Sequence, residues 1–299
     1  MRALGNYLTR GGLRASGFIS LLAVLILLLP IALYPLIYPL CGVPLALVTM
    51  RRGQFAGLQA LLVSCALTGI IYWLLGIGLD PILMIVTTIW LPVLGCAIVL
   101  RLTNAQGWMM LAAVSIGCAV LAGLRIYMND PAEWWRNELG PVLQEVFAVM
   151  AQEQPQAVLE TVLPLMNAML ISGMMVNLIT TMLLARWWQS VLFNPGGFGT
   201  EFAAIMLPRV ILLLMAVIVA ALLMLGVEQH SLLRDILIVL IIPYIFQGVA
   251  AAHRAVRSKN LSVYWLVCMY VLMLNLPMLL LIACLGMMDS LLNKRNAHP

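Results

Sequence analysis

The sequence predicts an all-α, polytopic helical membrane protein with eight or nine transmembrane helices, and three observations support this fold class. First, 64% of the 299 residues are hydrophobic and only 9% are charged, whereas about a quarter of the residues in a soluble domain are charged. Second, uncharged stretches near the roughly 20 residues needed to cross a bilayer follow one another along the chain. Third, the basic residues lie mainly at the ends of these stretches. We therefore expect residues 1–299 to form a single integral membrane domain.

The first apolar region, Gly17–Met50, is expected to form a short, proline-broken hairpin of two helices. It contains no charged residue, but it contains four prolines that interrupt helix hydrogen bonding; these are Pro30, Pro35, Pro39 and Pro44. Arginines precede the region, and Arg51 and Arg52 follow it. Because the positive-inside rule favours the cytoplasm for both arginine groups, the chain should enter the membrane and return. Since lipid cannot satisfy freed carbonyl groups, residues 30–44 should pack against other helices or line a wet cavity.

Seven further apolar stretches, each with at most one charged residue, mark the remaining spans. They are 55–78, 82–100, 107–127, 161–185, 210–227, 235–252 and 261–286. Placing most of the sixteen basic residues on the cytoplasmic side predicts a multi-pass protein of a bacterial inner (plasma) membrane with a cytoplasmic N-terminus. Lys294 and Arg295 are the exception, because an odd number of spans leaves them outside. The expected count therefore stays between eight and nine.

The one long polar segment, 128–160, is expected to form an amphipathic helix on the periplasmic surface. Asp130, Pro131 and Glu133 follow the pattern of an N-cap, a proline in the first turn and a capping-box acid. Apolar residues then recur at helical spacing opposite three glutamates; the apolar set is Leu139, Val142, Leu143, Val146 and Met150, and the glutamates are Glu138, Glu145 and Glu153. This acidic face is unlike that of helices that bind anionic lipid, so the helix should rest on protein.

Sequence patterns typical of catalysis and of metal binding are absent. The three histidines, His230, His253 and His298, are too far apart to share a metal in a local motif, and the six cysteines occur singly. General acid–base catalysis needs paired titratable groups, and no such pair occurs within the apolar stretches. We therefore expect no enzymatic activity and no cofactor or metal. The formal charge of +5 is explained by basic helix ends, so no nucleic-acid partner is expected.

The polar residues of the apolar stretches are amides and hydroxyls. Asn167, Asn177 and Thr181 approximate one face of a single helix, and Asn275 lies two residues before Pro277 on the last span. One interpretation is that they form interhelical hydrogen bonds, each worth about 0.6–2 kcal/mol in a membrane. The other is that they line a cavity for a small neutral or weakly polar ligand. Because no carboxylate lies in the middle of a span, a proton relay is not expected.

A glycine-rich stretch, Asn194–Phe202, is the most distinctive polar loop. Its glycines, including Gly196 and Gly197, could present backbone N–H groups to a phosphate, but no Lys-Ser/Thr follows, so a Walker loop is excluded. A tight cytoplasmic turn between helices is the favoured interpretation over a ligand loop. Glu201 and Arg209 lie eight residues apart, about two helical turns. They are expected to face one side of a helix and to form a structural ion pair near the headgroups.

The C-terminal half resembles the YybS-like family of bacterial integral membrane proteins over about residues 160–280. The resemblance rests on the asparagine-bearing stretch 161–185, the exit Arg186-Trp187-Trp188, the turn 194–199 and the segment from Phe202 through Leu207-Pro208-Arg209. That family is similar in hydropathy to the substrate-binding S-components of energy-coupling-factor vitamin transporters. This resemblance implies ligand capture, with an ATPase partner supplying energy.

The leading hypothesis is therefore a transport-related membrane protein that holds a small ligand between its helices. Its expected partners are the lipid bilayer and membrane or ATPase proteins. The alternative is a non-transporting scaffold or partner-binding protein, whose polar faces only join helices. A closed pocket lined by Asn177 and Asn275 would favour transport, and a solid bundle would favour the scaffold.

Overall fold

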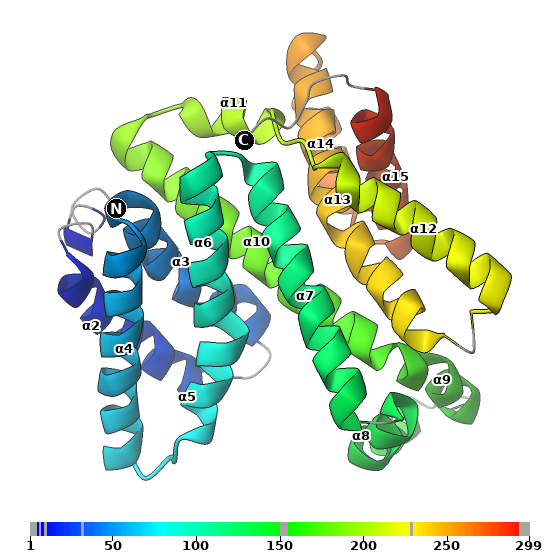
Figure 1. Ribbon diagram of the computed structural model, residues 1–299, viewed down its shortest axis with the longest axis horizontal. Coiled ribbons are helices and arrows are strands. Elements are labelled where there is room, and N and C mark those ends of the chain that lie inside the picture. The colour runs from blue at the N-terminus through cyan, green and yellow to red at the C-terminus, as the bar shows by residue number, and fades with distance from the viewer. Residues whose placement is uncertain are drawn as a thin grey trace. The chain divides into compact units, whose positions relative to one another are not determined.

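The computed structural model describes residues 5, 7–8, 11–30, 33–128, 130–149, 155–227 and 230–292, and these residues form helices and turns with no strand among them. Within the described residues, five helices are long and apolar enough to cross a membrane, namely Gln54–Leu74, Asp80–Thr103, Gln106–Met128, Val158–Phe193 and Ser231–Ser258. Three apolar helices are shorter, namely Gly12–Leu27, Arg209–Leu225 and Leu276–Leu292. The expected all-α class is confirmed (Figure 1), whereas the count of eight or nine spans stays a prediction.

The chain divides into two compact units. Unit 1 comprises Met1–Ala113, Val176–Pro208 and Pro243–Pro299, and unit 2 comprises Val114–Met175 and Arg209–Ile242. The division falls within three helices, α7 (Gln106–Met128), α10 (Met166–Phe193) and α13 (Ser231–Ser258), so each unit holds a part of each.

The expected N-terminal hairpin is present in unit 1. Helix α2 (Gly12–Leu27) and helix α3 (Tyr34–Arg52) pack against each other. The chain leaves the helix around Pro30, whereas Pro35 lies in the first turn of α3, where a missing N–H group has no cost. The other two prolines lie inside α3, which continues through them.

Helix α3 is the most enclosed element of unit 1. Its residues 41–50 are all buried, and the helix contacts α2, α4 (Gln54–Leu74) and α6 (Leu91–Thr103). At Gly42, an added Cβ would lie 2.7 Å from Thr181 and 2.8 Å from Val93, so no larger side chain fits there. The second half of the proline-rich segment therefore packs against other helices, as expected.

Hydroxyl groups line the contact between α2 and α4. Ser16 donates to the Ala60 carbonyl at 3.2 Å, and Ser64 donates to the Ser16 carbonyl at 3.3 Å. Further along, Ser20 donates to the Ser64 carbonyl at 3.2 Å. Small side chains allow two helix backbones to approach closely, and the hydroxyls then bond across the contact. These hydrogen bonds hold α2 and α4 together.

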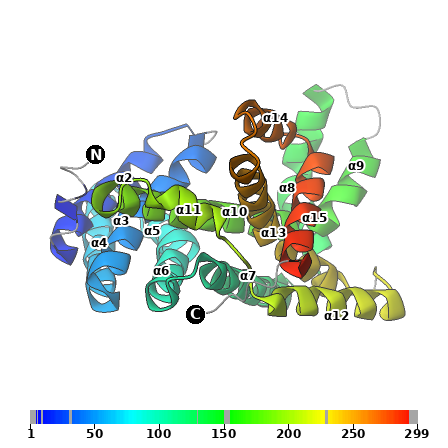
Figure 2. The ribbon, with the colours of Figure 1, turned by 90° about the horizontal axis from the view of Figure 1, so that it is seen from above.

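The last predicted span, 261–286, is not one helix. The structure has a short α14 (Tyr264–Leu272) and a longer α15 (Leu276–Leu292), separated by the turn at Met273–Asn275. Pro277 explains the break, because proline disfavours helical geometry in the residue before it and is tolerated in a first turn. Helix α15 lies beside α13 (Figure 2), where a Cβ on Gly248 would lie 1.9 Å from the Ile282 oxygen. Glycine is therefore required at this crossing.

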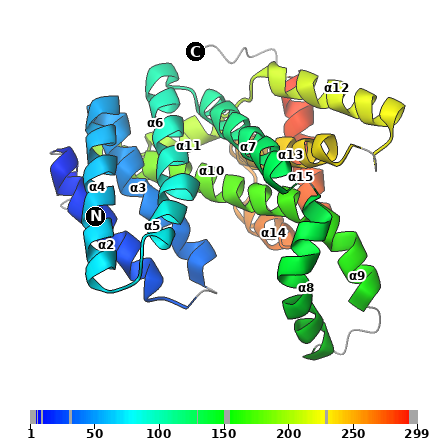
Figure 3. The ribbon, with the colours of Figure 1, turned by 60° about the horizontal axis from the view of Figure 1, so that its bottom comes forward.

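In unit 2, the described residues of the polar segment 128–160 form two helices that lie side by side (Figure 3), rather than the single amphipathic helix expected. They are α8 (Pro131–Val149) and α9 (Pro155–Val162), and a 3-10 turn, η3 (Leu163–Leu165), joins α9 to α10. The predicted N-cap is confirmed, because Asp130 Oδ1 accepts hydrogen bonds from the backbone N–H groups of Ala132 (3.0 Å) and Glu133 (3.2 Å). Unit 2 also contains α12 (Arg209–Leu225).

Candidate functional site

The four predicted ligand residues lie in both units, with Asn167 in unit 2 and the others in unit 1. The Thr181 side chain is buried, and its hydroxyl donates to the Asn177 carbonyl of its own helix at 2.9 Å. Asn177 is half-buried, and Asn275 is exposed in the turn between α14 and α15. Thr181 thus has a local bond and a packing role against Gly42 of α3. A ligand role for these residues stays a prediction.

Asn167 forms an interhelical hydrogen bond. Its Oδ1 accepts a 2.7 Å bond from the indole N–H of Trp135 on α8, and the asparagine is 3% exposed. A buried amide oxygen without a partner would cost about 1–3 kcal/mol. Asn167 therefore anchors α8 to the first turn of α10.

The glycine-rich stretch forms a tight turn that is held by local bonds. Gly196 has a φ of 85°, in the left-handed region that favours glycine, and α11 (Gly197–Ala203) starts directly after it. The Ser190 hydroxyl donates to the Asn194 carbonyl at 2.7 Å and accepts from the Phe198 N–H at 3.1 Å. The favoured interpretation, a turn between helices, is confirmed.

The expected ion pair between Glu201 and Arg209 was based on a single continuous helix, and this expectation is wrong. Helix α11 ends at Ala203, and the next helix begins only at Arg209, so helical spacing does not relate the two residues. Glu201 instead accepts a 2.7 Å bond from Arg186 Nε, and Arg186 also donates to Gln189. Arg209 is exposed at the start of α12.

A partly buried polar cluster in unit 1, formed by Gln247, Arg254 and Asp289, was not predicted. Arg254 pairs with Asp289 Oδ1 and donates to the Ala203 carbonyl at 2.6 Å. Gln247, which is fully buried, donates to Asp289 Oδ2 at 3.0 Å and accepts from the Leu207 N–H at 3.1 Å. The only sequence signal is the seven-residue spacing of Gln247 and Arg254, which places both on one helix face.

This Gln247–Arg254–Asp289 cluster fixes the non-helical connection after α11. Hydrogen bonds engage both carboxylate oxygens of Asp289, both ends of the Gln247 amide and two guanidinium nitrogens of Arg254. A buried charge pair is stable only when such additional bonds satisfy it. With its groups already bonded to each other, the cluster is suited to holding α13, α15 and residues 203–207 together.

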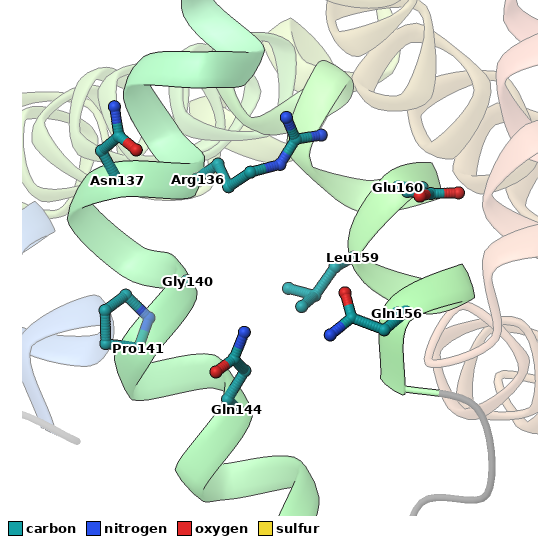
Figure 4. A pocket seen from close by; sticks show the side chains of 8 residues that line it. All are labelled: Arg136, Asn137, Gly140, Pro141, Gln144, Gln156, Leu159 and Glu160. Atoms are coloured by element: carbon teal, nitrogen blue, oxygen red, sulfur yellow. The ribbon is translucent and has the colours of Figure 1, made fainter.

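An open polar groove of about 410 Å³ lies between α8 and α9 in unit 2. Its volume falls within the roughly 300–1,000 Å³ range of small-molecule sites. The lining residues are Arg136, Asn137, Gly140, Pro141 and Gln144 from α8, with Gln156, Leu159 and Glu160 from α9. Figure 4 shows Arg136 reaching from α8 toward α9, and the amides of Gln144 and Gln156 facing each other. The groove therefore offers donors and acceptors from both walls.

One polar contact anchors each wall of the groove. The Asn167–Trp135 bond holds α8 at the residue before Arg136. On the other side, Arg234 of α13 donates to the Pro164 carbonyl in η3, directly after α9, and pairs with the buried Asp235 at 3.0 Å. These two contacts fix α8 and the turn after α9, and fixed walls are the pre-organisation that a binding site requires.

Comparison with known proteins identifies one family. Residues 137–290 match the family described as "Predicted membrane protein (DUF2232)". The matched range includes the Gln247–Arg254–Asp289 cluster and every groove residue except Arg136. No curated protein and no solved structure matches the chain.

Proposed function

The chain belongs to this family of predicted membrane proteins, and we propose that it captures a small polar solute in the groove between α8 and α9 as a transport-related step. The observation that carries the proposal is the groove itself, with its volume of about 410 Å³, its polar walls and their two separate anchors. The net charge of the lining is zero, since Arg136 and Glu160 are its charged members. A neutral or weakly polar solute fits that balance.

The charge pattern supports a place for the groove on the periplasmic side of a bacterial inner membrane. Helix α8 carries Glu133, Glu138 and Glu145, whereas the last turns of α3 and α6 in unit 1 carry arginines, namely Arg51, Arg52 and Arg101. The positive-inside rule favours the cytoplasm for the arginine-bearing turns and the opposite side for α8. The N-terminus is then cytoplasmic. The expected likeness to YybS-like proteins and S-components suggests an order of steps. The solute is captured on the periplasmic side, and it then crosses the membrane with partner proteins that supply energy.

A binding screen tests the proposal. The purified full chain in detergent is heated with each member of a panel of sugars, amino acids, short peptides, vitamins, organic acids and amines. A ligand that binds only the folded state at about 100 times its Kd stabilises that state by about 2.7 kcal/mol and raises the melting temperature. We expect at least one polar solute to do so.

A pair of substitutions on α8 locates the binding. Gly140→Phe places a ring in the groove, because an added Cβ meets only Arg136 at 3.8 Å. Val142→Phe adds the same bulk to an exposed position outside the lining. The first variant should lose the ligand-induced shift and the second should keep it. If both variants keep the shift, or if no solute binds, the chain is better described as a scaffold.

A further inference from the structure

We infer that the solute of the α8–α9 groove is a neutral polyhydroxyl compound of hexose size. This inference rests on the proposed function and names the substrate class of the same groove. It is drawn from the side chains that face the groove, from the ratio of donors to acceptors among them and from the charges that the two helices carry.

Four side chains face the groove from its two walls. Figure 4 shows Arg136 reaching from α8 toward α9, and the amides of Gln144 and Gln156 opposite each other. Leu159 of α9 is buried and points into the space between the two helices. Arg136 forms no ion pair with another described residue, so its guanidinium is available to a solute. The groove therefore presents hydrogen-bonding groups on both walls and an apolar surface on the α9 wall.

The three polar side chains offer more donors than acceptors. A guanidinium has five N–H donors and no acceptor, and each glutamine amide has two donors and one oxygen with two lone pairs. Together they present about two donors for each acceptor lone pair. A hydroxyl group has the complementary ratio, with two lone pairs and one donor, whereas a primary amide offers equal numbers and a ketone offers no donor. Several hydroxyls on one carbon skeleton therefore satisfy the two walls best.

Neighbouring hydroxyls also match the shape of these side chains. A guanidinium donates two parallel N–H bonds. A glutamine amide donates to one hydroxyl through its nitrogen while its oxygen accepts from the next. Leu159 offers an apolar contact to the C–H groups of the same ring. The volume of about 410 Å³ lies in the range of small-molecule sites and suits a single sugar ring.

The charges around the groove favour a solute without net charge. Arg136 repels a cation, and the Glu160 carboxylate is turned to the side of α9 away from α8 (Figure 4), so it does not face a cation in the groove. An anion gains at Arg136, but α8 also carries Glu133, Glu138 and Glu145. Interactions between exposed charges extend over about 8 Å at physiological ionic strength, so these carboxylates oppose an anion. A neutral hydroxyl compound meets neither repulsion.

Three hexoses and their charged counterparts test the inference. Glucose, mannose and galactose are each compared with the corresponding uronate, which carries a carboxylate, and with the corresponding amino sugar, which carries an ammonium group. Affinities are measured by isothermal titration on the purified full chain in detergent. At least one hexose should bind, and both of its charged counterparts should bind at least fivefold more weakly. If no hexose binds, or if a charged counterpart binds as tightly as its parent, the inference is wrong.

Variants then assign the hydrogen bonds to side chains. Gln144→Met and Gln156→Met keep the length of the side chain and remove its amide, so each should weaken hexose binding at least fivefold. Asn137→Leu is the matched control, because it removes an amide that points to the side of α8 away from α9 (Figure 4). Glu160→Gln is a second control, and both controls should keep the starting affinity. The four side chains are exposed, so the variants should fold, which an unchanged ligand-free melting temperature checks. Unchanged affinity in both glutamine variants overturns the inference.

The outcomes separate this inference from the proposed function. If an amino acid or a vitamin binds, Gly140→Phe abolishes that binding and no hexose binds, the groove is a solute site and the polyhydroxyl assignment is wrong. If no solute binds, both the function and the ligand class are wrong. Sugars at high concentration also stabilise proteins because they are excluded from the protein surface. A rise in melting temperature that Gly140→Phe retains would therefore show exclusion without binding in the groove, and it would overturn the inference.

Discussion

Replacement of Asp289 by asparagine removes one acceptor from the Gln247–Arg254–Asp289 cluster with almost no change of shape. Aspartate offers two acceptor oxygens, one to Arg254 and one to Gln247, whereas asparagine offers one. Gln247 cannot compensate by turning its amide, because its oxygen already accepts the Leu207 N–H. Whichever way the new amide is oriented, an N–H group is left facing another donor.

The expected cost follows from the burial of the pair. The side chains of Arg254 and Asp289 are 26% and 9% exposed, so solvent replaces little of the lost bonding. Breaking a fully buried pair costs about 3–5 kcal/mol, and a single bond to a charged group contributes about 1.5–3 kcal/mol. Arg254 keeps its hydrogen bond to the Ala203 carbonyl and part of its contact with solvent. We therefore expect Asp289→Asn to lower the free energy of unfolding by about 2–3 kcal/mol. At about 2–4 °C per kcal/mol, the melting temperature should fall by about 4–12 °C.

Glu201→Gln is the matched control, because it makes the same chemical change in a more exposed ion pair of the same unit. Glu201 and Arg186 are 33% and 24% exposed, and Arg186 also donates to Gln189. Partly exposed pairs of this kind contribute about 0.5 kcal/mol, so the shift should be about 1–2 °C. Both variants are measured by thermal unfolding in the same detergent. Equal shifts, or a gain in stability for Asp289→Asn, would refute the reasoning from burial.

Three further predictions concern packing, anchoring and topology. Gly248→Ala should severely reduce the yield of folded protein, because the new Cβ would collide with a backbone oxygen. The control Gly17→Ala meets nothing within 4 Å and should gain up to about 1 kcal/mol of helix propensity. The yields of the two variants are compared by size-exclusion chromatography in detergent, and similar yields would contradict the close crossing. Asn167→Leu should speed amide exchange in α8 about fivefold, the equivalent of about 1 kcal/mol, and unchanged exchange would show that the indole bond does not anchor this helix. In a cysteine-free background, an impermeant thiol reagent added outside should label Gln144→Cys but not Gly197→Cys, and labelling of both would contradict the proposed topology.

The features that the sequence predicted correctly are local ones. The N-terminal hairpin follows from prolines and flanking arginines, the α8 cap from Asp130 and the two residues after it, and the tight turn from Gly196. Each depends on chemistry within a few neighbouring residues. Pro277 was a local signal of the same kind for the break between α14 and α15. The prediction of one span followed the uniformly apolar residues on both sides of it instead.

The features that the sequence did not predict depend on contacts between distant residues. Arg254 and Asp289 are 35 residues apart, and Gln247 and Leu207 are 40 apart. Glu201 acquires Arg186 as its partner only because the chain leaves the helix after Ala203. The groove likewise forms only because α8 and α9 pack against each other. The hydrophobic periodicity of either helix alone does not predict that packing.

The enclosure of α3 imposes an order on how the chain is built into a membrane. Two of the helices that pack against it, α4 and α6, are synthesised after it. Until they emerge, the two prolines inside α3 leave backbone carbonyls that acyl chains cannot satisfy. We therefore expect the helix to stay beside the insertion machinery until the ribosome has passed Thr103. We expect α2, α3, α4 and α6 to leave that machinery as one assembled block rather than as successive hairpins.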